Sequence, residues 1–110
     1  MKPGFSLWII NKNDEKIFGI GPYKLLLLID EFGSLNKAAK WMNLSYTKAR
    51  NILNRAEAEL NITLLEREIG GAKGGGSTLT DEARILIDKY NEFMERSNQA
   101  IETIYKDIFD

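Results

Sequence analysis

The chain has 110 residues and a net charge of −1, and it contains neither histidine nor cysteine. The length fits a single domain, and the two missing residue types exclude disulfides, histidine-based acid–base catalysis and most zinc sites. No apolar run approaches the roughly 20 residues of a membrane-spanning helix, and the N-terminus lacks the layout of a signal peptide. We therefore expect a cytoplasmic protein with no enzymatic activity, no metal and no cofactor.

The charges are distributed unevenly along the chain. Residues 34–80 carry seven basic and four acidic side chains, a net charge of +3, whereas residues 81–110 carry four basic and eight acidic side chains, a net charge of −4. Screening in salt confines electrostatic attraction to about 8–10 Å, so a local patch matters more than the total. The basic centre is suited to phosphate; the alternative is scattered, solvated charge.

The first third of the chain predicts a β-hairpin followed by a helix. The stretches Ser6–Asn11 and Lys16–Phe18 flank residues with strong turn preferences. Pro22 suits the first turn of a helix, and Gly33 can end that helix in the left-handed conformation. Between them, apolar residues recur at helical spacing, which predicts a helix over residues 22–32. These residues are Leu25, Leu28, Ile29 and Phe32.

Residues 34–60 predict two helices joined by a three-residue break. Ser34 and Ser45 are good N-caps for helices over residues 35–42 and about 46–60. Each helix has one apolar face: Leu35, Ala38, Ala39 and Met42 in the first, and Ala49, Ile52, Leu53 and Ala56 in the second. Two helices joined by a tight turn are typical of the helix-turn-helix, whose second helix enters the major groove of DNA.

Polar side chains cover the outward face of the second of these helices. Arginine can pair with guanine edges, asparagine with adenine edges, and lysine with phosphate. The candidate DNA-binding residues, with the two capping serines included, are Ser34, Ser45, Tyr46, Thr47, Lys48, Arg50, Asn51, Asn54 and Arg55. The alternative is an amphipathic helix pair with a merely solvated face.

A glycine-rich segment lies between two short predicted strands, residues 63–67 and 78–79. A phosphate-binding P-loop needs its lysine directly after the last glycine, whereas Lys73 follows Ala72 here. We therefore predict a wing whose glycines allow close approach to the sugar-phosphate backbone and whose Lys73 binds a phosphate. The alternative is a loop with no role in binding.

The last 30 residues predict one long amphipathic helix. Thr80 is its N-cap, and acidic residues occupy its first turn, where the helix dipole favours them. Some 28 residues span roughly 42 Å, which exceeds what a core of this size can cover, so a second copy is the expected partner. The candidate dimer-interface residues are Leu86, Tyr90, Phe93, Ile101, Ile104 and Ile108.

Residues 22–90 resemble the N-terminal DNA-binding domain of the molybdate-responsive ModE regulators and, more distantly, LysR-type regulators. The resemblance rests on Ser34 with Ala38-Ala39, Ser45-Tyr46, Ala49, Leu65-Glu66-Arg67, Gly70-Gly71, Lys73-Gly74-Gly75-Gly76 and Leu79-Thr80. It implies an operator-binding dimer joined through the long helix. The sequence departs from the family at Arg50, where an aromatic residue is common.

Together these features predict an α+β, mainly α fold: a winged helix-turn-helix with an N-terminal β-hairpin and a long C-terminal dimerisation helix. Residues 1–80 are the expected DNA-binding domain and residues 81–110 its dimerisation helix. The expected function is transcriptional regulation by a homodimer on double-stranded DNA, and the alternative is a winged-helix module for protein interaction. ModE-like regulators sense molybdate through separate C-terminal domains. The sequence ends at Asp110 and leaves no residues for them, so a stand-alone relative and a fragment of a longer protein are both open.

Overall fold

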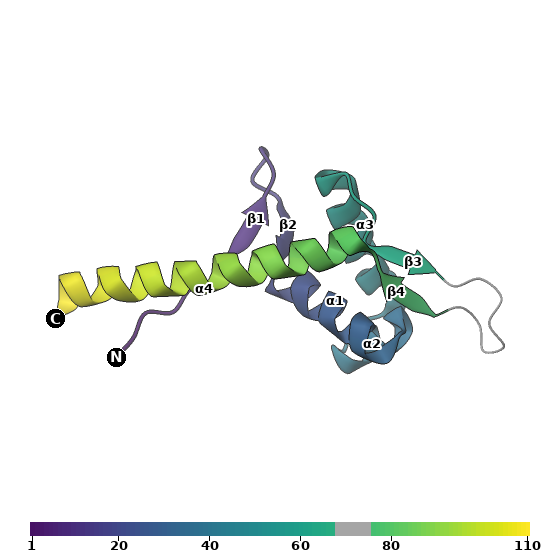
Figure 1. Cartoon of the computed structure of the whole chain (residues 1–110), viewed down its shortest axis with the longest axis horizontal. Helices are drawn as coiled ribbons and strands as arrows, with labels where there is room; N and C mark the ends of the chain where they lie inside the picture. Colours follow the sequence, from purple (N-terminus) through teal and green to yellow (C-terminus); the bar gives the residue numbers. More distant parts are fainter. Residues whose placement is uncertain (68–75) are drawn as a thin grey trace.

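The computed structural model describes residues 1–67 and 76–110. Three short helices gather around the first part of one long helix, which then extends past them (Figure 1) and gives the molecule dimensions of 60 × 29 × 25 Å. The elements are β1 (Trp8–Ile10), β2 (Lys16–Gly19), α1 (Ile20–Phe32), α2 (Leu35–Trp41), α3 (Tyr46–Leu60), β3 (Leu65–Arg67), β4 (Ser77–Leu79) and α4 (Asp81–Phe109). This arrangement confirms the predicted mainly α, winged helix-turn-helix fold.

The ends of the helices follow from side chains close by in the sequence. The residues that directly precede α2, α3 and α4 are Ser34, Ser45 and Thr80, respectively. The side-chain hydroxyl oxygen of each accepts a hydrogen bond from the backbone N–H three residues later, at 3.2, 3.0 and 3.0 Å. Gly33 ends α1 with a φ of 67°, and Asn43 turns the chain between α2 and α3 with a φ of 58°. The predicted caps and both left-handed residues are thereby confirmed.

Both hairpins form, with ends slightly different from those predicted. β1 pairs antiparallel with β2, and the register changes between Ile9 and Ile10. The position at the end of β2 requires glycine because the ring of Trp8 packs directly against Gly19. A Cβ at this position would lie 2.3 Å from that ring. β3 pairs with β4 from Leu65 opposite Leu79 onwards. α1 begins at Ile20, two residues earlier than predicted, because Pro22 still falls within the first turn, where its missing N–H has no helical partner to lose.

The core lies between α1, α2, α3 and the first half of α4. Small residues allow α2 and α3 to approach closely: Ala38, Ala39 and Ala49 are 0–1% exposed. Larger side chains fill the remaining volume, and the most buried of them are Phe18, Leu25, Leu26, Ile29, Leu53 and Leu64. This burial positions α3, so that its opposite face is left to solvent.

Tyr90 also belongs to this core, which corrects its assignment to a dimer interface. It is 2% exposed within the single chain, and its ring meets the edge of Phe18 at a centroid distance of 5.3 Å. Its hydroxyl donates a hydrogen bond to the carbonyl oxygen of Leu7 at 2.9 Å. Burial raises the pKa of this phenol. Tyr90 therefore anchors the N-terminal segment and offers almost no surface to a partner.

The second half of α4 leaves the core. Met94 is the last residue of α4 that packs against the core cluster. Further along, residues 1–3 share a hollow with Tyr105 and Lys106, so the chain's beginning runs beside its end (Figure 1). Among the described residues, no helix is long and apolar enough to cross a membrane.

Candidate nucleic-acid interface

α3 carries one buried face and one polar, exposed face. Ala49, Leu53 and Ala56 are fully buried and hold the helix against the core. The side chains that point away from them are exposed, as the helical spacing predicts; they are Thr47, Lys48, Asn51, Asn54 and Arg55. The orientation of α3 is therefore set by its small and branched apolar residues, and its polar residues are the ones accessible to a ligand.

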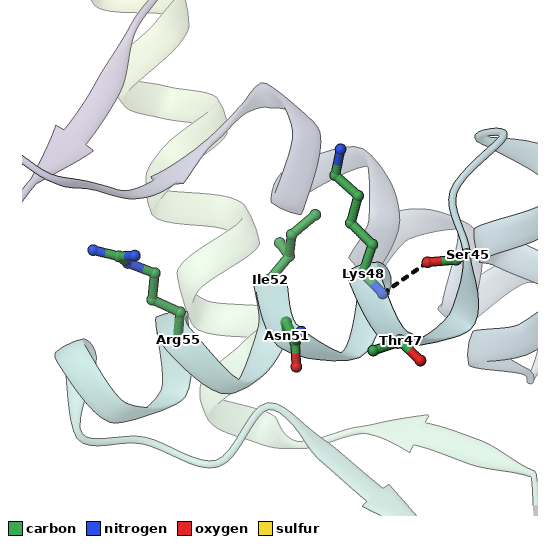
Figure 2. A pocket seen from close by; sticks show the side chains of 6 residues that line it. All are labelled: Ser45, Thr47, Lys48, Asn51, Ile52 and Arg55. Atoms are coloured by element: carbon green, nitrogen blue, oxygen red, sulfur yellow. Dashed lines mark hydrogen bonds between the residues drawn. The ribbon is translucent and has the colours of Figure 1, made fainter.

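Part of this exposed face forms a shallow depression along α3 (Figure 2). The long side chains of Lys48 and Arg55 reach out from the helix, whereas Thr47 and Asn51 stay closer to it. The depression is lined by Ser45, Thr47, Lys48, Asn51, Ile52 and Arg55. Five of these six residues are polar, and they combine hydrogen-bonding groups suited to base edges with cations suited to phosphate.

Other predicted DNA-binding residues do not line this depression. Ser34 caps α2 from the far end of the helix pair, so its hydroxyl oxygen already accepts a hydrogen bond. Arg50 is half-buried and does not line the depression. Tyr46 is 45% exposed at the start of α3. Lys73 lies outside the described residues. Thr47 and Asn51 are thus more accessible than Arg50.

Two lysines of α2 were not among the predicted DNA-binding residues. Lys37 and Lys40 lie on the exposed side of α2, opposite its buried residues. In helix-turn-helix proteins the first helix crosses the DNA backbone, a position in which lysine can neutralise phosphate. The signal was present in the sequence, because both lysines fall outside the apolar spacing of Leu35, Ala38 and Ala39.

Arg55, one of the predicted DNA-binding residues, is engaged by another side chain. Its Nη2 lies 2.6 Å from Oε2 of Glu15, a residue of the turn between β1 and β2. Asn11, in the same turn, donates from Nδ2 to Glu15 Oε1 and to Glu59 Oε1, each at 3.1 Å. The bond from Asn11 and then the pairing with Arg55 lower the pKa of the Glu15 carboxyl. Arg55, a predicted DNA-binding residue, is therefore paired with a carboxylate of the same chain.

The candidate dimer residues of α4 divide into two groups. Phe93, Ile104 and Ile108 are exposed by 47, 57 and 67%. Leu86 and Ile101 are half-buried in the single chain, and Leu86 packs against the core cluster. In the described part of the chain, no three His, Cys, Asp or Glu side chains come together in a group that could hold a metal ion.

The sequence is similar to a known family of bacterial regulators and to individual proteins of known role. Residues 22–84 match the model of the bacterial regulatory helix-turn-helix proteins of the lysR family. Similar curated proteins include the transcriptional regulator ModE of Haemophilus influenzae, 37% identical over 84 residues, which are 76% of this chain and 32% of that protein. The DNA-binding transcriptional dual regulator ModE of Escherichia coli is 31% identical over 98 residues, 87% of this chain and 37% of that protein. The chain spans about a third of the length of these curated relatives.

Solved structures share the fold. The DNA-binding domain of CbnR, in a complex with DNA, aligns with a TM-score of 0.57 and 22% identity over 73% of this chain and 86% of that one. CbnR itself, a LysR family transcriptional regulator, aligns with a TM-score of 0.55 and 22% identity over 73% of this chain and 26% of that one. The family match covers more than half of the sequence, and the chain therefore belongs to the LysR family of bacterial regulatory helix-turn-helix proteins.

Proposed function

We propose that this chain is the sequence-specific DNA-binding part of a transcriptional regulator, with α3 in the major groove. The observation that carries the proposal is the exposed polar face of α3, opposite Ala49, Leu53 and Ala56, inside the segment that matches the family. The relatives named for transcriptional regulation and the neighbour solved with DNA support it. A basic charge of +3 over residues 34–80 is consistent with a phosphate-rich partner.

The roles of individual side chains follow from their chemistry and position. Thr47 and Asn51 lie in the N-terminal half of α3, the part of a recognition helix that contacts base edges. Asparagine can pair in a bidentate manner with adenine. Lys48, with Lys37 and Lys40 of α2, is placed to bind phosphates on the flanks of the groove. The hairpin of β3 and β4 is the wing, which we assign to the neighbouring backbone.

We further propose that two copies pair through α4. The exposed Phe93, Ile104 and Ile108 lie on one side of the helix at spacings close to its repeat. Two-fold symmetry would place the two recognition helices roughly 34 Å apart, one turn of DNA, on a palindromic site. Residues 81–110 would then serve as the dimerisation helix of the domain.

The second candidate is a winged-helix module that binds a protein. The exposed side chain that favours it is Trp41 of α2, which is 71% exposed although its ring lies 5.8 Å from that of Phe32. Tryptophan is enriched at protein–protein interfaces relative to the rest of the protein surface. Salt dependence separates the two candidates, because only a phosphate-binding protein must lose affinity steeply as salt rises.

The test is selection of bound sequences from a random duplex library with the full chain, followed by titration of the selected site. Asn51→Ala is expected to lower discrimination at one base pair by about 1–3 kcal/mol. Asn98→Ala makes the same change at an exposed position of α4 and is the matched control. Absence of salt-sensitive binding to any duplex at low ionic strength would refute the DNA proposal and favour the protein-binding one.

A further inference from the structure

The turn of the N-terminal hairpin is fastened to the C-terminal half of α3. Within the turn, Oδ1 of Asn11 accepts hydrogen bonds from the backbone N–H groups of Asn13 and Glu15, at 2.9 and 3.0 Å. Across to α3, Glu15 contacts Arg55 at 2.6 Å and Asn11 contacts Glu59 at 3.1 Å. Hydrogen bonds within the turn thus hold the Glu15 carboxylate in the place where it pairs with the Arg55 guanidinium.

Arg55 stands where a recognition helix meets the edge of the groove. It follows Thr47 by eight residues, which corresponds to roughly 12 Å along the helix axis. The major groove is about 12 Å wide, so a helix with Thr47 at the base edges carries Arg55 toward the phosphates that border the groove. Arg55 also lines the same depression as Lys48 and Asn51. Its position is therefore that of a phosphate contact.

The charge of Arg55, however, is already paired with the Glu15 carboxylate. Both side chains of the pair are 48% exposed, so the ion pair is accessible to solvent and a DNA phosphate has to compete with Glu15 for the same guanidinium. Each phosphate that a protein neutralises adds about 0.9 to the slope of log affinity against log salt concentration. A cation held by a carboxylate of the same chain contributes less to both affinity and slope.

We infer that Glu15 is a positioning residue that withholds Arg55 from DNA phosphates and so lowers the affinity of the chain for DNA of any sequence. This inference rests on the proposed function, since it concerns the same face of α3. Weaker attraction to the backbone leaves base contacts a larger share of the binding energy, which favours discrimination between sites. The acidic residue acts through Arg55 and does not itself contact DNA.

The experiment measures binding of the full chain to a random-sequence duplex by fluorescence anisotropy, over salt concentrations from about 50 to 200 mM. Glu15→Gln keeps the shape of the side chain and removes its charge. We expect Glu15→Gln to bind the duplex more tightly than wild type, with a slope of log affinity against log salt concentration that is steeper by about 0.9. The ratio of its affinity to that of wild type should therefore fall roughly three- to fourfold across this range of salt. Circular dichroism of each variant establishes that the helices remain folded.

Asp14→Asn is the matched control. This substitution makes the same change of charge one residue away. Asp14 has a φ of 62°, a conformation that asparagine also adopts readily. The substitution is expected to leave the slope unchanged. A second control introduces Glu15→Gln into Arg55→Ala, where it should have no effect on the slope, because the residue through which Glu15 acts is gone.

The possible outcomes separate this inference from the proposed function. If Glu15→Gln shifts binding only as much as Asp14→Asn, or steepens the slope equally without Arg55, the inference is wrong while DNA binding stands. If the wild-type chain shows no salt-sensitive binding to any duplex, the proposed function fails first and the role of Glu15 fails with it.

Discussion

The hydroxyl of Thr80 donates a hydrogen bond to the carbonyl oxygen of Thr63 at 2.6 Å and, through the same oxygen, accepts one from the N–H of Ala83 at 3.0 Å. One side chain therefore caps α4 and ties its first turn to the segment that enters β3. Thr80 is 5% exposed; its bond with Ala83 is buried, and its bond with Thr63 is partly buried. The direction in which α4 leaves the domain depends on this junction, and the geometry of the proposed dimer would depend on it as well.

Thr80→Ala should lower the free energy of unfolding by about 1–3 kcal/mol. Loss of an N-cap costs about 1 kcal/mol, and the Thr63 carbonyl loses a partner in a partly buried site. Thr80→Ser retains the hydroxyl and should lose much less. Urea denaturation followed by circular dichroism measures both variants, and equal stability of Thr80→Ala and wild type would contradict this account of the junction.

Ala49→Leu should destabilise the chain by about 1–3 kcal/mol because the added carbons have no space between α2 and α3. Ala49 is 0% exposed and shares the core with Ala38 and Ala39. Ala58→Leu makes the same substitution on the exposed side of α3 and should change stability by less than about 0.5 kcal/mol. Thermal denaturation compares them; similar melting temperatures for the two variants would mean that α2 and α3 are not closely packed.

The ion pair between Asp30 of α1 and Arg84 of α4 should make stability depend on pH in acid. Arg84 donates to both carboxylate oxygens, at 2.8 and 3.2 Å, and these bonds lower the pKa of Asp30 in the folded chain. The unfolded chain therefore binds the proton first. The stabilisation is complete above the unfolded pKa of about 4 and is lost as the pH falls through the lower pKa of the folded state.

Arg84→Gln should accordingly reduce the urea midpoint at neutral pH and approach the wild-type value near pH 2. Arg96→Gln provides the control, because it removes the same charge from α4, where Arg96 pairs with Glu92 at 3.4 Å on an exposed surface. A deficit of Arg84→Gln that stays constant down to pH 2, after subtraction of the control, would show that the carboxylate of Asp30 is not the source.

Ile104→Lys should weaken self-association of the chain at least tenfold if α4 forms the dimer, since a charge buried at an apolar seam is costly. Ile104 is 57% exposed in the single chain, so the substitution leaves the core intact. Gln99→Lys adds the same charge to an exposed position on the opposite side of α4 and should leave association unchanged. Sedimentation equilibrium measures both, and a wild-type chain that stays monomeric at tens of micromolar would remove the basis of the proposal.

Local features of the fold were predictable because their causes lie within a few residues. A serine or threonine that caps a helix bonds to an N–H three residues later, so Ser34, Ser45 and Thr80 reveal the beginnings of α2, α3 and α4. Gly33 and Asn43 mark turns through their tolerance of positive φ. The apolar spacing of Ala49, Leu53 and Ala56 likewise identifies the buried face of α3 and, by elimination, the exposed face that we propose contacts DNA.

Two side chains have partners far away in the chain that short-range spacing could not reveal. Arg55 was predicted to bind DNA, and Glu15, with which it forms an ion pair, lies 40 residues earlier. Tyr90 shared the apolar stripe of α4, yet its hydroxyl reaches Leu7, 83 residues earlier, and its ring packs on Phe18. Helical periodicity identifies which face of a helix is apolar, but it carries no information on what covers that face.

The sequence alone determined the order of the elements, the caps of three helices, the buried face of α3 and the family, because each depends on residue type and short-range spacing. The tertiary structure decided which side chains are accessible. It joined the turn of the first hairpin to α3, assigned Tyr90 to the core, and left Phe93, Ile104 and Ile108 exposed. Accessibility depends on how elements distant in sequence pack together, and that packing determines which residues of α3 and α4 can meet a partner.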